Sequence, residues 1–333
     1  MKPLLQKLFA GQELSRSEAS RATDLMMRGE ATAAEIAGFL GALAGKGVAV
    51  DEIVGCAMSL RHHALPIKVQ RRDLIDVCGT GGDGADTFNI STTNALLLAA
   101  AGLGVCKHGN RAVSSRCGSA DVLEALGVKV DLSPDRVAAA IDQCGFGFIF
   151  APLFHPAMQH VAPIRRALGV RTIFNLLGPL VNPAPVKRQV LGVFESQLVN
   201  PMAEALLALD AERALVVWGA GGLDELSLTG PTQVAMIAEH KIRRFELNPA
   251  DFDLPLAAAH ELKGGDKEEN AAHTLAILQG HKSPKRDIVL MNAGAALVVA
   301  ELAESWRAGA SLAAELIDSG RAMATFEKIR AFV

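Results

Sequence analysis

The sequence predicts an α/β protein in which a small all-helical N-terminal domain precedes a larger α/β domain with a mainly parallel central sheet flanked by helices. Two features support this class. Residues 1–65 carry apolar residues at helical spacing and no run typical of a strand. From Leu74 onward, short apolar runs alternate with helical stretches, which is the pattern of an α/β sheet. We therefore expect the helical domain over residues 1–69 and the α/β domain over residues 70–333.

The N-terminal helices have recognisable starts and ends. Ser15 and Thr32 each have a glutamate three residues later, which is the capping-box pattern of a helix start. Gly29 stands where the first of these helices should stop. A further helix is expected over residues 51–65, because Pro66 cannot continue it.

The elements of the larger domain follow from apolar runs and helical periodicity. The expected strands cover residues 74–78, 104–106, 146–150 and 213–218, and the late helices cover about 268–279, 287–304 and 312–319. Parallel strands joined by helices place their carboxyl ends at one edge of the sheet, so we expect the functional loops there.

The composition disfavours several classes of function. The 333 residues carry a net charge of -3, so no large basic surface for nucleic acid is indicated. The five cysteines form no C-x-x-C pair, which favours reduced thiols and a cytoplasmic protein. The N-terminus lacks the pattern of a signal peptide, and the apolar stretch at residues 94–105 is shorter than a membrane span.

One string raises a specific question. Gly79-Thr-Gly-Gly-Asp-Gly84 follows an expected strand and fits G-x-G-x-x-G, the pattern of a dinucleotide-binding turn. Such a site needs a helix opening at the third glycine and an acidic residue about 20 positions on. The best helix start lies later, at residues 89–92, and no Asp or Glu occurs from residue 87 to residue 120. No Walker string is present either. The remaining interpretation is a glycine loop and helix N-terminus that bind another anion.

A second loop strengthens that interpretation. Residues 107–121 place a lysine, two arginines, two glycines and several hydroxyls between the next strand and a short helix at residues 122–126. Taken alone, glycines after a strand usually form only a tight turn, and Ser or Thr before an apolar run is usually only an N-cap. Together, two such loops at neighbouring strand ends predict a polyphosphate site.

Several strings, in this order and spacing, carry a family resemblance. They are Gly79-Thr-Gly-Gly-Asp83, Thr87-Phe-Asn-Ile-Ser-Thr92, Lys107-His-Gly-Asn-Arg111, Ser114-Ser115, Gly118-Ser-Ala-Asp-Val-Leu-Glu-Ala-Leu-Gly127 and Arg171-Thr-Ile-Phe-Asn-Leu-Leu-Gly-Pro179. The sequence resembles the anthranilate phosphoribosyltransferase family over nearly its whole length. The resemblance implies a homodimer, an active site in a hinge cleft between the two domains, and a return of residues 163–182 to the helical domain. The implied reaction is attack of the anthranilate amine on carbon 1 of phosphoribosyl pyrophosphate (PRPP), with release of pyrophosphate.

The resemblance also implies roles for individual residues. The residues expected to contact PRPP are Gly79, Gly82, Asp83, Thr87, Asn89, Ile90, Ser91, Thr92, Lys107, Ser115 and Ser119. Those expected to contact anthranilate are Gly79, His108, Asn110 and Arg165, and those expected to hold the cofactor Mg²⁺ are Ser91, Asp224 and Glu225. The residue types suit these roles, because Mg²⁺ prefers oxygen ligands and a guanidinium pairs with a carboxylate.

The residues leave some alternatives open. An aromatic amine is largely neutral at pH 7, so no general base is assigned, and His155 and His160 are interpreted as structural or solvated. A pyrimidine nucleoside phosphorylase on the same architecture is one rival, which the loop at residues 107–111 and the turn at residues 224–225 disfavour. A non-enzymatic nucleic-acid-binding relative is the other, and it would need a basic stripe that the sequence lacks.

Overall fold

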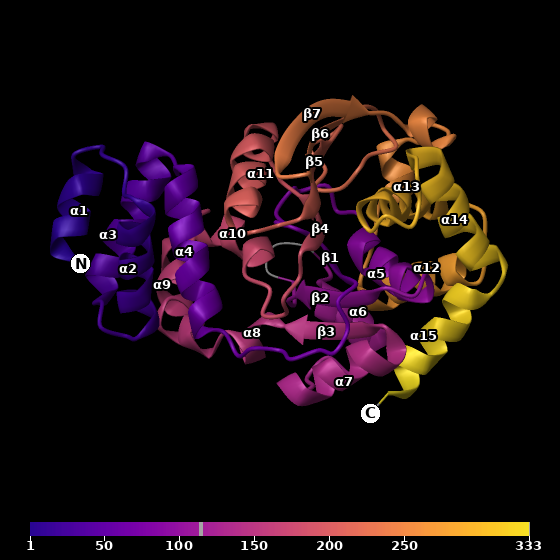
Figure 1. Ribbon diagram of the computed structural model, residues 1–333, viewed down its shortest axis with the longest axis horizontal. Coiled ribbons are helices and arrows are strands. Elements are labelled where there is room, and N and C mark those ends of the chain that lie inside the picture. Colours follow the sequence, from indigo (N-terminus) through magenta and orange to yellow (C-terminus); the bar gives the residue numbers. More distant parts are fainter. Residues whose placement is uncertain (113–115, 333) are drawn as a thin grey trace.

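The N-terminal part of the chain is a bundle of helices, at the left of Figure 1. The structure is a computed structural model that describes residues 1–112 and 116–332. The bundle contains α1 (Lys2–Phe9), α2 (Arg16–Met27), α3 (Ala33–Lys46) and α4 (Val50–His63). Both predicted capping boxes are confirmed, since the Ser15 and Thr32 hydroxyls accept from the backbone amides of Glu18 and Glu35.

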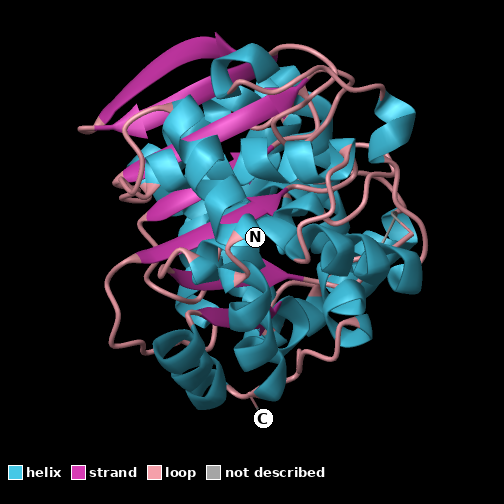
Figure 2. Ribbon diagram, turned by 90° about the vertical axis from the view of Figure 1, so that its right-hand side faces the viewer, coloured by secondary structure: helices cyan, strands magenta, loops and turns pink. Residues whose placement is uncertain are grey.

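The rest of the chain is built on one seven-stranded sheet with the order β3-β2-β1-β4-β5-β6-β7. The strands are β1 (Leu74–Gly79), β2 (Gly104–Gly109), β3 (Phe146–Phe150), β4 (Arg188–Gly192), β5 (Arg213–Gly219), β6 (Thr232–Ala238) and β7 (Lys241–Leu247). Strands β1 to β5 pair in parallel. Strands β6 and β7 extend the sheet beyond β5 and pair antiparallel. Figure 2 shows these strands stacked as a twisted sheet. The expected mainly parallel sheet is therefore confirmed.

Helices cover both faces of the sheet. In β5, Leu215 and Val217 belong to one buried cluster, whereas Ala214 and Val216 belong to another, so alternate side chains enter different cores. The helices of this domain are α5 (Ile90–Ala100), α6 (Ser119–Ala125), α7 (Pro134–Cys144), α11 (Val199–Ala208), α12 (Lys267–Leu278), α13 (Pro284–Val299), α14 (Trp306–Asp318) and α15 (Arg321–Ala331). In the described residues, no helix combines the length and apolar character that a membrane span requires.

The β6–β7 hairpin is an element that the sequence analysis did not anticipate. Its strands pair from Thr232↔Leu247 to Ala238↔Lys241. The two-residue turn consists of Glu239 and His240, with φ of 52° and 55°. A two-residue hairpin turn needs positive φ and normally shows this as Asn-Gly or Asp-Gly. Because neither dipeptide is present, the turn carried no recognisable signal.

A segment in the middle of the chain connects the sheet to the helical bundle. It contains α8 (Ala151–Phe154), α9 (Ala162–Leu168) and α10 (Phe174–Leu177). Helix α9 packs against α3, and α10 packs against α4. Val161 and Phe174 share one buried cluster with Phe39 of the bundle and with Val216 of the sheet. The division into two domains at residues 69 and 70 remains a prediction.

Candidate active site

The glycine loop leaves β1 at the centre of the sheet and turns over the end of β4. The Thr80 amide donates to the Gly192 carbonyl oxygen at 2.9 Å. Gly81, Gly82 and Gly84 have φ of +68°, +74° and +71°. Glycine adopts this left-handed backbone without steric cost. Backbone amides in a glycine loop of this conformation can bind an anion.

An acidic turn lies directly against this loop. The Gly81 amide donates to Asp224 Oδ2 at 2.7 Å. A Cβ added at Gly79 would lie 2.1 Å from that oxygen, and one added at Gly192 would lie 1.5 Å from the Asp224 backbone oxygen. Both positions therefore require glycine. Because the chain runs outward from β1 in both directions, the ends of β1 and β4 form the topological switch point where α/β sheets bind ligands.

Lys107 brings a buried positive charge to the same edge. Its side chain is 2% exposed, and its Nζ donates to the Val77 carbonyl oxygen at 2.8 Å and to Ser91 Oγ at 3.3 Å. Beside it lies the buried carboxylate of Asp76, which accepts from Asn182 Nδ2 at 2.8 Å. Burial raises the pKa of Asp76 to about 6, and the Lys107 charge opposes that shift. The Val77 carbonyl oxygen thus fixes the Lys107 ammonium, and the Ser91 hydroxyl at the start of α5 lies beside it.

Three carboxylates, those of Asp83, Asp224 and Glu225, lie close together beside the glycine loop. The Asp224 amide donates to Asp83 Oδ2 at 3.4 Å. Burial raises the pKa of Asp224, and the Asp83 charge raises it further. The pKa of Glu225 is also raised, first by burial and then by Asp224, while Lys107 and the Ser91 amide oppose the shift. Carboxylates that repel one another in this way favour a bound cation.

These side chains suit Mg²⁺ bound partly by the substrate, rather than a metal ion whose ligands all come from the protein. Within residues 1–112 and 116–332, no cluster of three or more His, Cys, Asp or Glu side chains has the spacing of a metal cage. Mg²⁺ usually keeps several waters and binds through one or two carboxylates together with substrate phosphates. Asp224, Glu225 and the Ser91 hydroxyl, the expected Mg²⁺ ligands, have the oxygen chemistry of such a smaller set, and their role as ligands remains a prediction.

Comparison with known proteins agrees with this geometry. The model of the glycosyl transferase family a/b domain matches residues 71–323, and that of the helical bundle domain of the same family matches residues 2–64. Proteins named anthranilate phosphoribosyltransferase from Moorella thermoacetica and Rhizobium rhizogenes are 49% and 51% identical over 333 and 329 residues. Those matches cover 100% and 99% of this chain, and 98% and 97% of the relatives.

The chain belongs to the anthranilate phosphoribosyltransferase family. The crystal structure of the Thermus thermophilus anthranilate phosphoribosyltransferase is 47% identical and has a TM-score of 0.94, with 99% of this chain and 98% of that chain covered. The Saccharomyces cerevisiae enzyme in complex with PRPP and Mg is 29% identical, with a TM-score of 0.90 over 98% of this chain and 96% of that chain.

His108 links the sheet to the middle segment in this member of the anthranilate phosphoribosyltransferase family. Its Nδ1 lies 3.0 Å from the Gly178 carbonyl oxygen, so this nitrogen carries the hydrogen. Its Nε2 lies 3.2 Å from His155 Nε2, which must then be the donor. Burial lowers the pKa of His108 to about 3 and that of His155 to about 4. His155, interpreted from sequence as structural or solvated, is thus a buried partner of a candidate site residue.

The other residues expected at the anthranilate site lie on different elements. Arg165 is on α9, with its guanidinium carbon 5.2 Å from the centroid of the Phe174 ring, and partial burial lowers its pKa. Asn110 is exposed at the end of β2, where its Oδ1 accepts from the Arg111 amide at 2.8 Å. The structure gives no direct contact between Arg165 and Asn110, so their common role remains a proposal.

Arg171 is a residue that the sequence analysis assigned no role. Its guanidinium donates to the Gly82 carbonyl oxygen and to Glu195 Oε1, and it stacks 4.1 Å from the centroid of the Phe194 ring. It joins the segment that carries Arg165 to the glycine loop. Arg171 lies in the string 171–179, which contributed to the family resemblance. That string alone does not reveal its contact with Gly82 in the glycine loop.

The remaining expected PRPP contacts differ in accessibility. Ile90 and Thr92 are 2% and 1% exposed, so their side chains are closed to a ligand. The Ile90 amide already donates to the Phe88 carbonyl oxygen at 2.8 Å, which leaves the Thr92 amide at the start of α5 as the group that could meet one. Thr87 and Ser119 are half-buried, and Ser119 Oγ donates to the Asn110 carbonyl oxygen at 3.2 Å. Ser115 lies outside the described residues.

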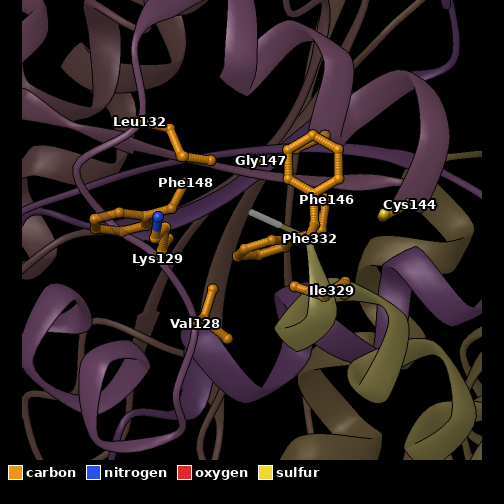
Figure 3. Close-up of a pocket in the computed structure, with 10 residues that line it drawn as sticks. Val128, Lys129, Leu132, Cys144, Phe146, Gly147, Phe148, Ile329 and Phe332 are labelled. Atoms are coloured by element: carbon orange, nitrogen blue, oxygen red, sulfur yellow. The ribbon is translucent and has the colours of Figure 1, made fainter.

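A small cavity lies near the C-terminus, beside β3. It is lined by apolar side chains such as Phe146, Ile329 and Phe332, together with Lys129 (Figure 3). Its volume of about 10 Å³ has room for roughly one water molecule. It is therefore too small to hold a substrate.

Proposed function

We propose that this chain transfers the phosphoribosyl group of PRPP to the amine of anthranilate, giving N-(5-phosphoribosyl)anthranilate and pyrophosphate, the second step of tryptophan biosynthesis from chorismate. Membership of the anthranilate phosphoribosyltransferase family carries this activity. The observation that supports it within the molecule is the meeting of the glycine loop, Lys107 and the acidic turn at one sheet edge. These groups offer amides, a cation and metal ligands to a polyphosphate.

The main task of the site is to stabilise the leaving pyrophosphate. The bond from carbon 1 to the pyrophosphate oxygen breaks while the ribose ring gains positive character and the leaving group gains negative charge. Amides of the loop at Gly79 and Gly82, the α5 N-terminus at Ser91 and the Lys107 ammonium would bind that charge. Because Lys107 is already held by the Val77 carbonyl, little reorganisation is needed when PRPP binds.

Anthranilate then supplies the nucleophile. Its amine nitrogen forms the bond to carbon 1 and releases a proton. We propose that Arg165 and Asn110 bind the carboxylate, with His108 and the Gly79 backbone beside the ring. No general base is assigned, because an aromatic amine is already neutral at pH 7. His108 donates through Nδ1 and accepts through Nε2 within the protein, which suits a positioning role.

Mg²⁺ would be held by Asp224, Glu225 and the Ser91 hydroxyl. The S. cerevisiae relative is described in complex with PRPP and Mg, which supports the same cofactor here. When bound, the ion neutralises charge on the pyrophosphate. The protein's own contribution is to hold the Asp224 carboxylate close to the glycine loop, through the Gly81 amide and the absence of a side chain at Gly79.

The wider organisation of the protein is also part of the proposal. We propose a homodimer located in the cytoplasm, with a helical domain over residues 1–69 joined by residues 163–182, and an α/β domain over residues 70–333. The packing of α9 on α3 and of α10 on α4 supports the return of the middle segment. Five free cysteines support a reducing compartment. Sedimentation at several protein concentrations would test the dimer.

Anthranilate fluorescence provides the direct test. Purified protein should remove the anthranilate signal over time only when PRPP and Mg²⁺ are both present. The double variant Asp224→Asn, Glu225→Gln should need much more Mg²⁺ for half-maximal rate, because two of its proposed ligands lose their charge.

Two outcomes would contradict the proposal in different ways. If folded wild-type protein leaves the fluorescence unchanged with both substrates and Mg²⁺, the transferase activity is wrong. If the Mg²⁺ titration of the double variant overlays that of the wild type, the carboxylates are not metal ligands.

A further inference from the structure

A directional chain of hydrogen bonds connects the C-terminal helices to the PRPP loop. The Gly265 amide donates to Asn270 Oδ1 at 2.9 Å, and Asn270 Nδ2 donates to Asn89 Oδ1 at 3.0 Å. Asn89 Nδ2 in turn donates to the Cys117 carbonyl oxygen at 3.1 Å. The first donor and the last acceptor are backbone groups whose polarity cannot change. The orientation of both side-chain amides between them is therefore determined.

The orientation of Asn89 matters because the ligand is an anion. Asn89 precedes the first residue of α5, and its side chain makes no capping bond to that helix. An amide nitrogen carries two hydrogens, so the one directed to Cys117 leaves a second donor for a phosphate or ribose oxygen. In the reversed orientation Asn89 would present its carbonyl oxygen, which repels a phosphate. We infer that Asn270 is a positioning residue for PRPP binding, which acts by fixing the Asn89 amide with its donor side toward the ligand.

The turn before α12 is built to bring Asn270 to this place. The Gly264 amide donates to the Asp86 carbonyl oxygen at 2.8 Å, and the Phe88 amide donates to the Leu262 carbonyl oxygen at 3.3 Å. A Cβ at Gly264 would lie 2.7 Å from the Phe88 backbone and 2.7 Å from Asn270 Oδ1. Only glycine allows the two chain segments to approach this closely. Asn270 itself is 1% exposed, so a purely apolar residue would have been the ordinary choice there.

The same chain also connects the two anion-binding loops. Asn89 follows the glycine loop, whereas Cys117 precedes Ser119 in the loop after β2. Among the described residues, the Asn89 amide joins the two loops through Cys117, and the contact of Lys107 Nζ with Ser91 Oγ at 3.3 Å joins them a second time. Loss of the Asn270 donor would let Asn89 turn and would loosen the link through Cys117. The inference rests on the proposed PRPP contact of Asn89.

The variant Asn270→Asp tests this role with little change in shape. Ionised aspartate keeps an oxygen for the Gly265 amide and loses the donor to Asn89. Because burial raises the pKa of a carboxyl, binding is measured at about pH 8 and above, where the aspartate is ionised. We expect the dissociation constant of PRPP, measured by calorimetry with Mg²⁺ and without anthranilate, to rise about tenfold, the effect of one lost ligand hydrogen bond. The KM of anthranilate at saturating PRPP should change by less than about twofold.

Thr274→Val is the matched control. Thr274 lies one turn later on α12, is buried, and pairs its hydroxyl with that of Thr93 at 3.0 Å. This variant should lower the unfolding temperature and leave PRPP affinity unchanged. Gly264→Ala provides a second variant should Asn270→Asp not fold, and it should weaken PRPP binding by displacing the same turn.

The outcomes separate this inference from the proposed function. If wild-type protein does not bind PRPP or consume anthranilate, the proposed function fails before any variant is compared. If wild type is active and Asn270→Asp binds PRPP as tightly as wild type, the positioning role is wrong. The same conclusion follows if Thr274→Val weakens PRPP binding as much as Asn270→Asp, because the effect would then be one of general stability.

Discussion

The two halves of the candidate site are held in different ways. On the phosphate side, Lys107 and Asp76 are buried in the sheet, and the glycine loop is bonded to the acidic turn through Gly81 and Asp224. On the acceptor side, Arg165 is only half-buried and its described partner is an aromatic ring, while Asn110 is exposed. The phosphate half is therefore formed before any ligand binds, whereas the acceptor half depends on how the middle segment packs.

The difference follows from what each half must recognise. Stabilising a polyphosphate leaving group requires fixed donors and charges, because their reorganisation during the reaction would cost catalysis. A flat aromatic acid requires an apolar surface and one or two polar contacts. Arg171 and His108 connect the halves, since one contacts the Gly82 carbonyl and the other the Gly178 carbonyl.

The largest effect is expected for Lys107→Met, which tests the phosphate half. Methionine fills similar space without the charge, so kcat should fall about 100- to 1,000-fold as leaving-group stabilisation is lost. Steady-state kinetics with saturating substrates would measure this. Lys129→Met is the control, because Lys129 lines the small C-terminal cavity and has no proposed contact with a substrate, so kcat should be unchanged. A loss smaller than about tenfold for Lys107→Met would mean that the lysine only supports the sheet.

A smaller and more selective effect is expected for Arg165→Ala, which tests the acceptor half. The KM of anthranilate should rise roughly tenfold or more, because a charge-assisted contact to its carboxylate is lost, while the KM of PRPP should change little. Arg166→Ala on the exposed side of the same helix serves as the control. Equal losses for both substrates would show that Arg165 does not distinguish them and would contradict the assignment.

The smallest expected effect is a pH dependence of stability that arises from His108 and His155, which lie between the two halves. The pKa values of His108 and His155 are lowered to about 3 and about 4, against about 6.5 for a free histidine. Between pH 6.5 and pH 4 these two side chains therefore bind protons in the unfolded chain that they do not bind in the folded chain. Each histidine should therefore lower the stability as the pH falls through this window, by roughly 1.4 kcal/mol per pH unit. The raised pKa values of the buried carboxyls Asp76, Asp224 and Glu225 act in the opposite direction over the same range.

The variant His155→Gln would show whether this pair is responsible. Glutamine cannot be protonated in this range, so the unfolding temperature at pH 4, relative to that at pH 6.5, should be higher in the variant than in wild type. His281→Gln, at an exposed position, should follow the wild-type profile. If His155→Gln also follows it, other groups set the acid sensitivity.

Much of this architecture could be predicted from the sequence, because strong local patterns mark it. The capping boxes at Ser15 and Thr32, the strand at residues 146–150 and the late start of α5 agree with the structure. Other elements had no local pattern. The β6–β7 turn uses Glu239 and His240 at positive φ, and helix α15 has no capping side chain at its start.

The site shows the same limit. The glycine loop and the lysine could be found from motifs, since their chemistry is contained in a short string. The roles of Asp76, Arg171 and Asn270 come from contacts between distant parts of the chain. Asn182, which bonds to Asp76, is 106 residues away from it. A single sequence does not indicate which residues so far apart along the chain will be in contact in the folded protein.

These distant contacts have a consequence for how the protein is made. The Gly81–Asp224 bond spans 143 residues, and the Asn89–Asn270 bond spans 181. During synthesis on the ribosome, the glycine loop emerges long before the acidic turn and α12 that hold it. The phosphate site can therefore form only when most of the chain has been translated, and contacts of such long range are formed slowly.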